Sequence, residues 1–106
     1  MQEITLENQP NQQFSISLGG AAYVISLRTL ANGATLADIE IDNEPLVRGL
    51  LCRGNELLLP YPYQARGGNF LFTTADGRYP YYTDFGGSCR FYFISAEELA
   101  NANATA

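Results

Sequence analysis

Hydrophobic and polar residues alternate along much of the chain, which is the pattern of β-strands with one buried face. Residues 13–30 hold two such runs on either side of Gly19-Gly20, so we predict a β-hairpin around a glycine turn. A second hairpin signal, Asn32-Gly33, follows, because both residues tolerate a positive φ at low cost. Residues 37–42 alternate between aliphatic and acidic residues and predict a two-faced strand, which a turn at residues 42–45 ends.

The second half of the chain predicts strands of a less regular pattern. Residues 46–52 are apolar at both parities, which predicts a strand that is covered on both faces or broken by a bulge at Gly49. Two prolines make the segment 57–63 an extended edge or a loop, since proline cannot donate a ladder hydrogen bond. The remaining predicted elements are a strand at 69–74, an aromatic loop or interrupted strand at 79–87, and a strand at 90–94.

One short helix is predicted near the C-terminal end. Ser95 and Glu98 have the spacing of a capping box, and Glu97 and Glu98 fall in the first turn, where the helix dipole favours acids. We expect the tail, residues 101–106, to fray. The predicted fold class is all-β: a single β domain over residues 1–100, forming a small antiparallel sandwich or barrel of about six to eight short strands with one short C-terminal helix.

Composition narrows the functional classes. The formal charge is −5, from 11 acidic residues and 6 arginines, and the chain has no lysine and no histidine. An acidic chain of this kind binds polyanions poorly, so we expect no nucleic-acid partner. Without histidine the chain lacks the commonest general base and metal ligand, and a serine or cysteine nucleophile would lack its usual partner. We therefore predict that the protein is not an enzyme and uses no cofactor.

The start of the chain is acidic and polar, and no apolar run is long enough to cross a membrane. We therefore expect no membrane association and a protein that stays in the cytoplasm unless a larger assembly carries it out. In a reducing cytoplasm the two cysteines, Cys52 and Cys89, are expected to be buried thiols. A disulfide between them would require the strands that carry them to be adjacent.

Three carboxylates, Asp38, Glu40 and Asp42, share one face of a predicted strand at a spacing of about 7 Å. Such a set could bind a hard cation or hydrolyse a glycosidic bond. However, a calcium site normally takes about six to eight oxygens from a curved loop, and a glycosidase needs a substrate cleft. A solvated outer face is the favoured interpretation, and we predict no metal site.

Aromatic residues cluster in two proline-containing segments, around residues 61–63 and 79–85. Tyrosine and arginine are enriched at protein interfaces, whereas core packing and the stacking of a sugar or single-stranded nucleic acid are the alternatives. The absence of tryptophan and the negative charge disfavour stacking. The candidate interface residues are Tyr61, Tyr63, Arg66, Tyr79, Tyr81, Tyr82 and Phe85.

Several segments, in the same order along the chain, resemble the small plug-type proteins of contractile-phage baseplates. These segments are Gln2–Leu6, Asn11–Phe14, Pro45–Gly49, Gly68–Phe72, Pro80–Gly86, Phe91–Phe93 and Glu97–Leu99. The similarity spans nearly the whole chain and rests on spacing and residue type. The chain differs from the family in its two cysteines and in its short polar C-terminal tail.

The resemblance implies a structural component of a contractile phage tail baseplate, located at the central hub near the tube and the spike and without catalytic residues. It implies protein partners in the hub, tube and spike, copies in multiples of three, and assembly into the virion in the host cytoplasm. Edge strands and aromatic loops would dock the neighbours, by strand addition and by buried tyrosine anchors. The alternative function is a small β-sandwich module that binds a carbohydrate or a receptor.

Overall fold

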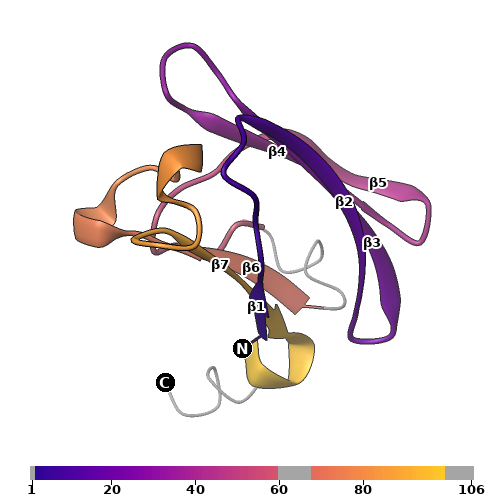
Figure 1. Ribbon diagram of the computed structural model, residues 1–106. Coiled ribbons are helices and arrows are strands. Elements are labelled where there is room, and N and C mark those ends of the chain that lie inside the picture. The colour runs from indigo at the N-terminus through magenta and orange to yellow at the C-terminus, as the bar shows by residue number, and fades with distance from the viewer. Residues whose placement is uncertain (1, 60–67, 100–106) are drawn as a thin grey trace.

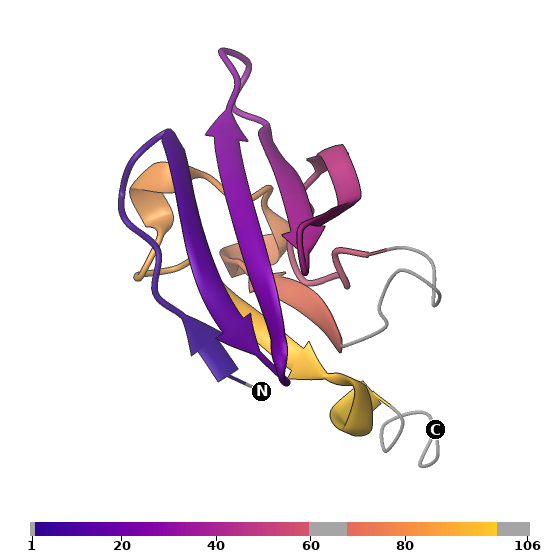
Figure 2. The same cartoon turned by 90° about the vertical axis from the view of Figure 1, so that its right-hand side faces the viewer.

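The computed structural model describes residues 2–59 and 68–99 and shows two antiparallel sheets facing one another (Figures 1 and 2). The first sheet has the strand order β2-β3-β4-β5 and the second the order β1-β7-β6. The strands of the first sheet are β2 (Asn11–Leu18), β3 (Ala21–Thr29), β4 (Thr35–Ile41) and β5 (Glu44–Leu51). Those of the second are β1 (Gln2–Ile4), β6 (Gly68–Thr73) and β7 (Arg90–Ser95).

Helical structure is confined to short segments within the described residues. Two 3-10 turns, η2 (Ala75–Gly77) and η3 (Tyr82–Asp84), lie between β6 and β7, and a helical turn at residues 96–99 follows β7. The predicted capping box is present, because Glu98 N–H donates to Ser95 Oγ at 3.2 Å and Ser95 N–H donates to Glu98 Oε1 at 3.2 Å. The all-β fold class and the short C-terminal helix are thus confirmed.

The hairpin turns of the first sheet lie where the sequence predicts them. Leu18 pairs with Ala21 across Gly19-Gly20, whose φ angles of 57° and 84° define the two-residue turn that fits strand twist. The next connection is a five-residue loop, 30–34, that contains the predicted Asn32-Gly33 pair. The turn predicted at residues 42–45 is narrower than expected, because only Asp42 and Asn43 turn and Glu44 already pairs in β5.

β5 contains the bulge that the sequence indicated at Gly49. The pairing of β4 with β5 shifts register between Ala37 and Ile39, and Gly49 has a φ of 63°, which favours glycine. The Asp38 side chain accepts a hydrogen bond from the Gly49 N–H at 2.6 Å. A carboxylate on the neighbouring strand therefore holds the bulge in place.

Aromatic side chains from both sheets form the centre of the core. Tyr23 of β3 meets Phe70 of β6 edge to face, with ring centroids 5.5 Å apart. Phe70 and Phe72 both stack on Phe91 of β7, at 5.4 and 4.4 Å. These three phenylalanines have no exposed surface, so the alternating runs of β6 and β7 place their apolar sides toward the first sheet.

Beside β6, the side chain of a buried asparagine makes hydrogen bonds to backbone groups that would otherwise pair with another strand. The Asn69 side chain accepts hydrogen bonds from the Leu59 N–H (2.9 Å) and the Phe70 N–H (2.8 Å), and it donates to the Leu59 carbonyl at 3.0 Å. With Asn69 only 3% exposed, these contacts satisfy polar groups that water does not reach. They tie the segment after β5 to the second sheet.

Both cysteines are buried free thiols, as predicted. Burial is the main cause that raises the pKa of Cys52 to about 12, and the nearby Cys89 adds to it. Burial likewise raises the pKa of Cys89 to about 11. Both thiols are consequently neutral at physiological pH, which is the unreactive form.

The aromatic core gives a first prediction. We expect Phe91→Ala to lower the free energy of unfolding by about 3–5 kcal/mol, because it removes a ring that stacks on two others and leaves a cavity. Urea denaturation monitored by circular dichroism measures this loss. Leu57→Ala is the control, since Leu57 is 48% exposed and its truncation should cost under about 1 kcal/mol. Losses of equal size would contradict the assignment of the core.

The thiols give a second prediction. At pH 8 the folded protein should leave Cys52 and Cys89 unlabelled by a maleimide, and both should react once urea unfolds the chain. The raised pKa values also predict that the free energy of unfolding falls as the pH rises from about 9 toward 11, because the unfolded thiols ionise first. Rapid labelling of the folded protein would show that the thiols are accessible.

Candidate docking surface

The candidate site is the aromatic loop, residues 79–85, in the connection between β6 and β7 (Figure 1). The loop follows η2, includes η3 and carries three tyrosines that reach solvent. The loop is held to the first sheet at its start. Thr35, a buried residue of β4, donates a hydrogen bond from its hydroxyl to the Pro80 carbonyl at 2.8 Å. Pro80 itself is buried, so this contact fixes the loop where it leaves the surface.

A second anchor comes from the segment between β1 and β2. The Asn8 side chain donates two hydrogen bonds, to the Tyr82 carbonyl at 2.9 Å and to the Phe85 carbonyl at 2.8 Å. The Cys89 N–H donates to the Asp84 carbonyl at 3.0 Å and closes the far end of the loop. The loop conformation is therefore set by residues from three different parts of the chain.

Three of the candidate interface residues reach solvent on this loop. Tyr79 is 56% exposed, and Tyr81 and Tyr82 are half-buried with ring centroids 4.8 Å apart. A hydrogen bond with Tyr82 is the main cause that raises the pKa of Tyr81, and the Asp84 carboxylate adds a smaller effect. The Tyr81 hydroxyl therefore stays protonated at neutral pH and can donate or accept a hydrogen bond.

Phe85 differs from the tyrosines with which the sequence grouped it. It is 4% exposed and stacks on Phe72 of β6, with ring centroids 6.1 Å apart. In the single chain Phe85 belongs to the core and supports the loop from beneath. The other three candidate residues, Tyr61, Tyr63 and Arg66, lie outside the described residues.

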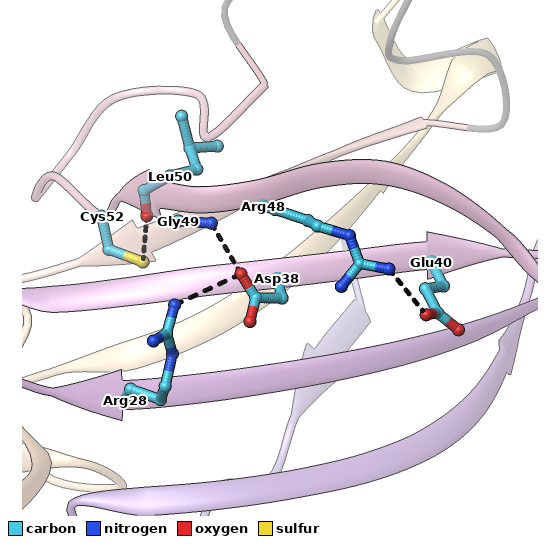
Figure 3. A network of polar contacts seen from close by, with 7 residues as sticks. All are labelled: Arg28, Asp38, Glu40, Arg48, Gly49, Leu50 and Cys52. Atoms are coloured by element: carbon cyan, nitrogen blue, oxygen red, sulfur yellow. Dashed lines mark hydrogen bonds and ion pairs between the residues drawn. The ribbon is translucent and has the colours of Figure 1, made fainter.

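The three carboxylates that the sequence placed on one strand face are engaged separately. Asp38 and Glu40 lie on β4, as Figure 3 shows, whereas Asp42 lies in the turn after β4, so the predicted set of three on one strand is wrong for Asp42. Asp38 contacts Arg28 at 3.5 Å in addition to the Gly49 N–H, and Glu40 contacts Arg48 at 3.5 Å. Asp42 accepts a hydrogen bond from the backbone N–H of Ala22 at 3.0 Å. The strand thus forms a solvated outer face with cross-strand charge pairs, opposite the buried Ala37, Ile39 and Ile41.

Among residues 2–59 and 68–99, no group of three or more His, Cys, Asp or Glu side chains is arranged to hold a metal ion. No helix in the same part of the chain is long and apolar enough to span a bilayer.

The anchors of the loop are residues that the sequence analysis missed. Asn8 forms hydrogen bonds with residues 74 and 77 positions away along the chain, and Thr35 with a residue 45 positions away. Their sequence surroundings resemble those of any polar residue in a loop or a strand. Only the packing of the two sheets brings them to the aromatic loop.

Comparison with known proteins gives one family. The family described as "Cyanophage baseplate Pam3 plug gp18" matches residues 1–97 of this chain. A search of curated proteins found no match. The matched region includes both sheets, the anchored aromatic loop and the buried aromatic core. Because the match covers nearly the whole chain, the protein belongs to the baseplate plug family of tailed phages and has a structural role in the virion tail.

Proposed function

We propose that this chain docks at the central hub of a contractile tail baseplate, beside the tube and the spike, through protein–protein contacts made by its aromatic loop. The observation that carries the proposal is the loop itself: three tyrosines that reach solvent on a backbone fixed by Thr35 and Asn8. Tyrosine supplies a large contact area with few rotatable bonds, and a fixed loop loses little conformational entropy on binding.

Family membership supports contacts with other tail proteins. The proposal adds which proteins these neighbours are and how many copies of this chain each tail holds. The neighbours are the hub, tube and spike proteins, and the copies number a multiple of three, because a ring contact at a three- or six-fold centre repeats around the axis. Assembly takes place in the host cytoplasm. Tyr61, Tyr63 and Arg66 remain candidate interface residues in this proposal.

The experiment that tests the proposal is quantitative mass spectrometry of purified tails separated from heads. The chain should be present with the tails, in a ratio to a tube protein of known copy number that gives three or six copies per tail. Absence from the tails, with abundant chain in the lysate, would contradict the proposal and favour a free ligand-binding module.

The tyrosines give a specific prediction. We expect Tyr79→Ala and Tyr81→Ala to lower incorporation into tails, because a tyrosine anchor contributes about 2 kcal/mol to an interface, or roughly a thirtyfold change in affinity. Tails from a phage that lacks the wild-type copy, complemented with each variant, are quantified by mass spectrometry. Tyr92→Ala is the matched control, since Tyr92 is a half-buried tyrosine on β7 rather than on the loop. Equal incorporation of all three variants would refute the role of the loop.

The Asn8 anchor gives another prediction. Asn8→Ala should destabilise the loop by about 1 kcal/mol, because it removes two donors to the loop carbonyls. Hydrogen exchange of the Asp84 and Phe85 amides should accelerate while exchange in β3 and β7 stays as in the wild type. Gln9→Ala, a change at the neighbouring exposed residue, should leave both unchanged.

A further inference from the structure

Strands at the border of a sheet have unpaired backbone groups, and proteins protect them with charge, proline, bulges, short length or a covering segment. Here the border strands are β2 and β5 in the first sheet and β1 and β6 in the second. The backbone groups of these four strands are protected to different degrees, and the least protected strand is the candidate for pairing with another chain.

Two of the borders are protected by sequence. β5 begins with Glu44 and Pro45 and bulges at Gly49, so its backbone cannot continue a regular ladder. β1 has only three residues, and Glu3 of this strand forms an ion pair with Arg90 at 3.3 Å.

The outer side of β6 is covered by the chain itself. The Asn55 N–H donates to the Phe72 carbonyl at 2.7 Å, and the Leu58 N–H donates to the Phe70 carbonyl at 2.8 Å. The Asn69 side chain continues this cover to Leu59.

Within residues 2–59 and 68–99, β2 has none of these protections beyond its start at Gln12. Its sequence, Asn11–Leu18, has no charge and no proline, and its pairing with β3 runs through eight consecutive residue pairs without a bulge. The whole stretch 8–27 contains no Asp, Glu, Lys or Arg, so all 11 acidic residues and all 6 arginines of the chain lie outside it.

The free backbone groups of β2 belong to its odd-numbered residues. Thr29 N–H donates to the Pro10 carbonyl at 2.7 Å, so the backbone carbonyl of Pro10 points toward β3. Because backbone groups alternate along an antiparallel strand, the N–H and C=O groups of Gln13, Ser15 and Ser17 point away from β3, toward the open edge of the sheet. Within the described residues β2 pairs with β3 alone, and the Gln12 side chain, which bonds to Glu7, occupies the start of the edge. The accessible edge is therefore Gln13–Ser17.

The surroundings of this edge suit an added strand. On the core side, Phe14 and Ile16 are only partly buried and lie at the rim of the core. On the outer side, a hollow of about 290 Å³ has a mixed lining that includes the small side chains of Ser15, Ser17 and Ala22 beside Val24 and Asn43. A strand placed beside β2 would direct alternate side chains to these two sides.

We propose that the Gln13–Ser17 edge binds an extended segment of a different baseplate protein, which adds as a strand to the four-stranded sheet. Apolar side chains of that segment cover Phe14 and Ile16, and small or uncharged polar ones lie over the serine-lined hollow. This inference rests on the proposed function, because the partner is a neighbour in the tail.

The occupant is not a second copy of this chain. A five-residue edge at about 3.4 Å per residue and about 10 Å of sheet thickness offers only about 170 Å² per chain, whereas a stable interface buries about 1,200 Å² or more in total. Pairing of β2 with its own copy also creates a two-fold contact, which makes dimers and does not close a ring of three. A segment of a different protein can continue from the edge onto other surfaces and so bury more area, and its binding does not impose two-fold symmetry.

The test compares Ser15→Pro with Ser15→Ala in complemented phage. Proline removes the outward N–H of the edge and leaves the β2–β3 bonds in place, whereas alanine keeps that N–H. We expect incorporation into tails to fall about tenfold or more for Ser15→Pro and to stay at the wild-type level for Ser15→Ala. Wild-type incorporation of Ser15→Pro would overturn the proposal, while presence of the wild-type chain in tails would still support the proposed function.

A second measurement does not depend on how well the proline variant folds. A photoreactive benzophenone side chain at position 17 should crosslink, in assembled tails, to an extended segment of another tail protein, and the same group at position 48 on β5 should not. Crosslinks from position 17 to a second copy of this chain, or to no protein, would overturn the proposal. Absence of the wild-type chain from tails would instead overturn the proposed function on which it rests.

Discussion

The contact between aromatic rings across the two sheets is the interaction on which the rest of the structure depends. Each sheet forms its own ladder, and Tyr23 from one side meets Phe70 and Phe93 from the other at centroid distances of 5.5 and 5.9 Å. Burial of these rings supplies most of the attraction between the sheets, because apolar area removed from water is the main favourable contribution to folding. The polar anchors of the aromatic loop act only after this contact has brought the sheets together.

The same arrangement explains how the aromatic loop, our proposed docking surface, can be both exposed and ordered. Asn8, on the segment from β1 to β2, and Thr35, on β4, come from two separate parts of the chain, and both bond to the loop that precedes β7. Their positions are fixed by a core that lies behind them. An interface of this kind changes little in shape when it binds, so most of the contact energy is retained as affinity.

Local patterns allowed most of the strands to be predicted, and long-range contacts explain what could not be. Glycine and asparagine turns, the bulge at Gly49 and the capping box at Ser95 are encoded by a few neighbouring residues, so the sequence identifies them directly. β1 is a three-residue strand whose pairing partner lies about ninety positions away, and no local pattern marks it. The exposure of the tyrosines and the burial of Phe85 likewise follow from packing, because all of them have the same aromatic signature in the sequence.

The unbroken pairing of β2 with β3 also has a mechanical consequence. A load applied along these strands would stretch all of their hydrogen bonds at the same time, whereas a load applied across them would open the bonds one after another from one end. A neighbour attached parallel to β2 therefore pulls in the direction in which the sheet resists most. In a phage tail, the direction in which a neighbour is attached therefore decides how large a force these two strands withstand before they separate.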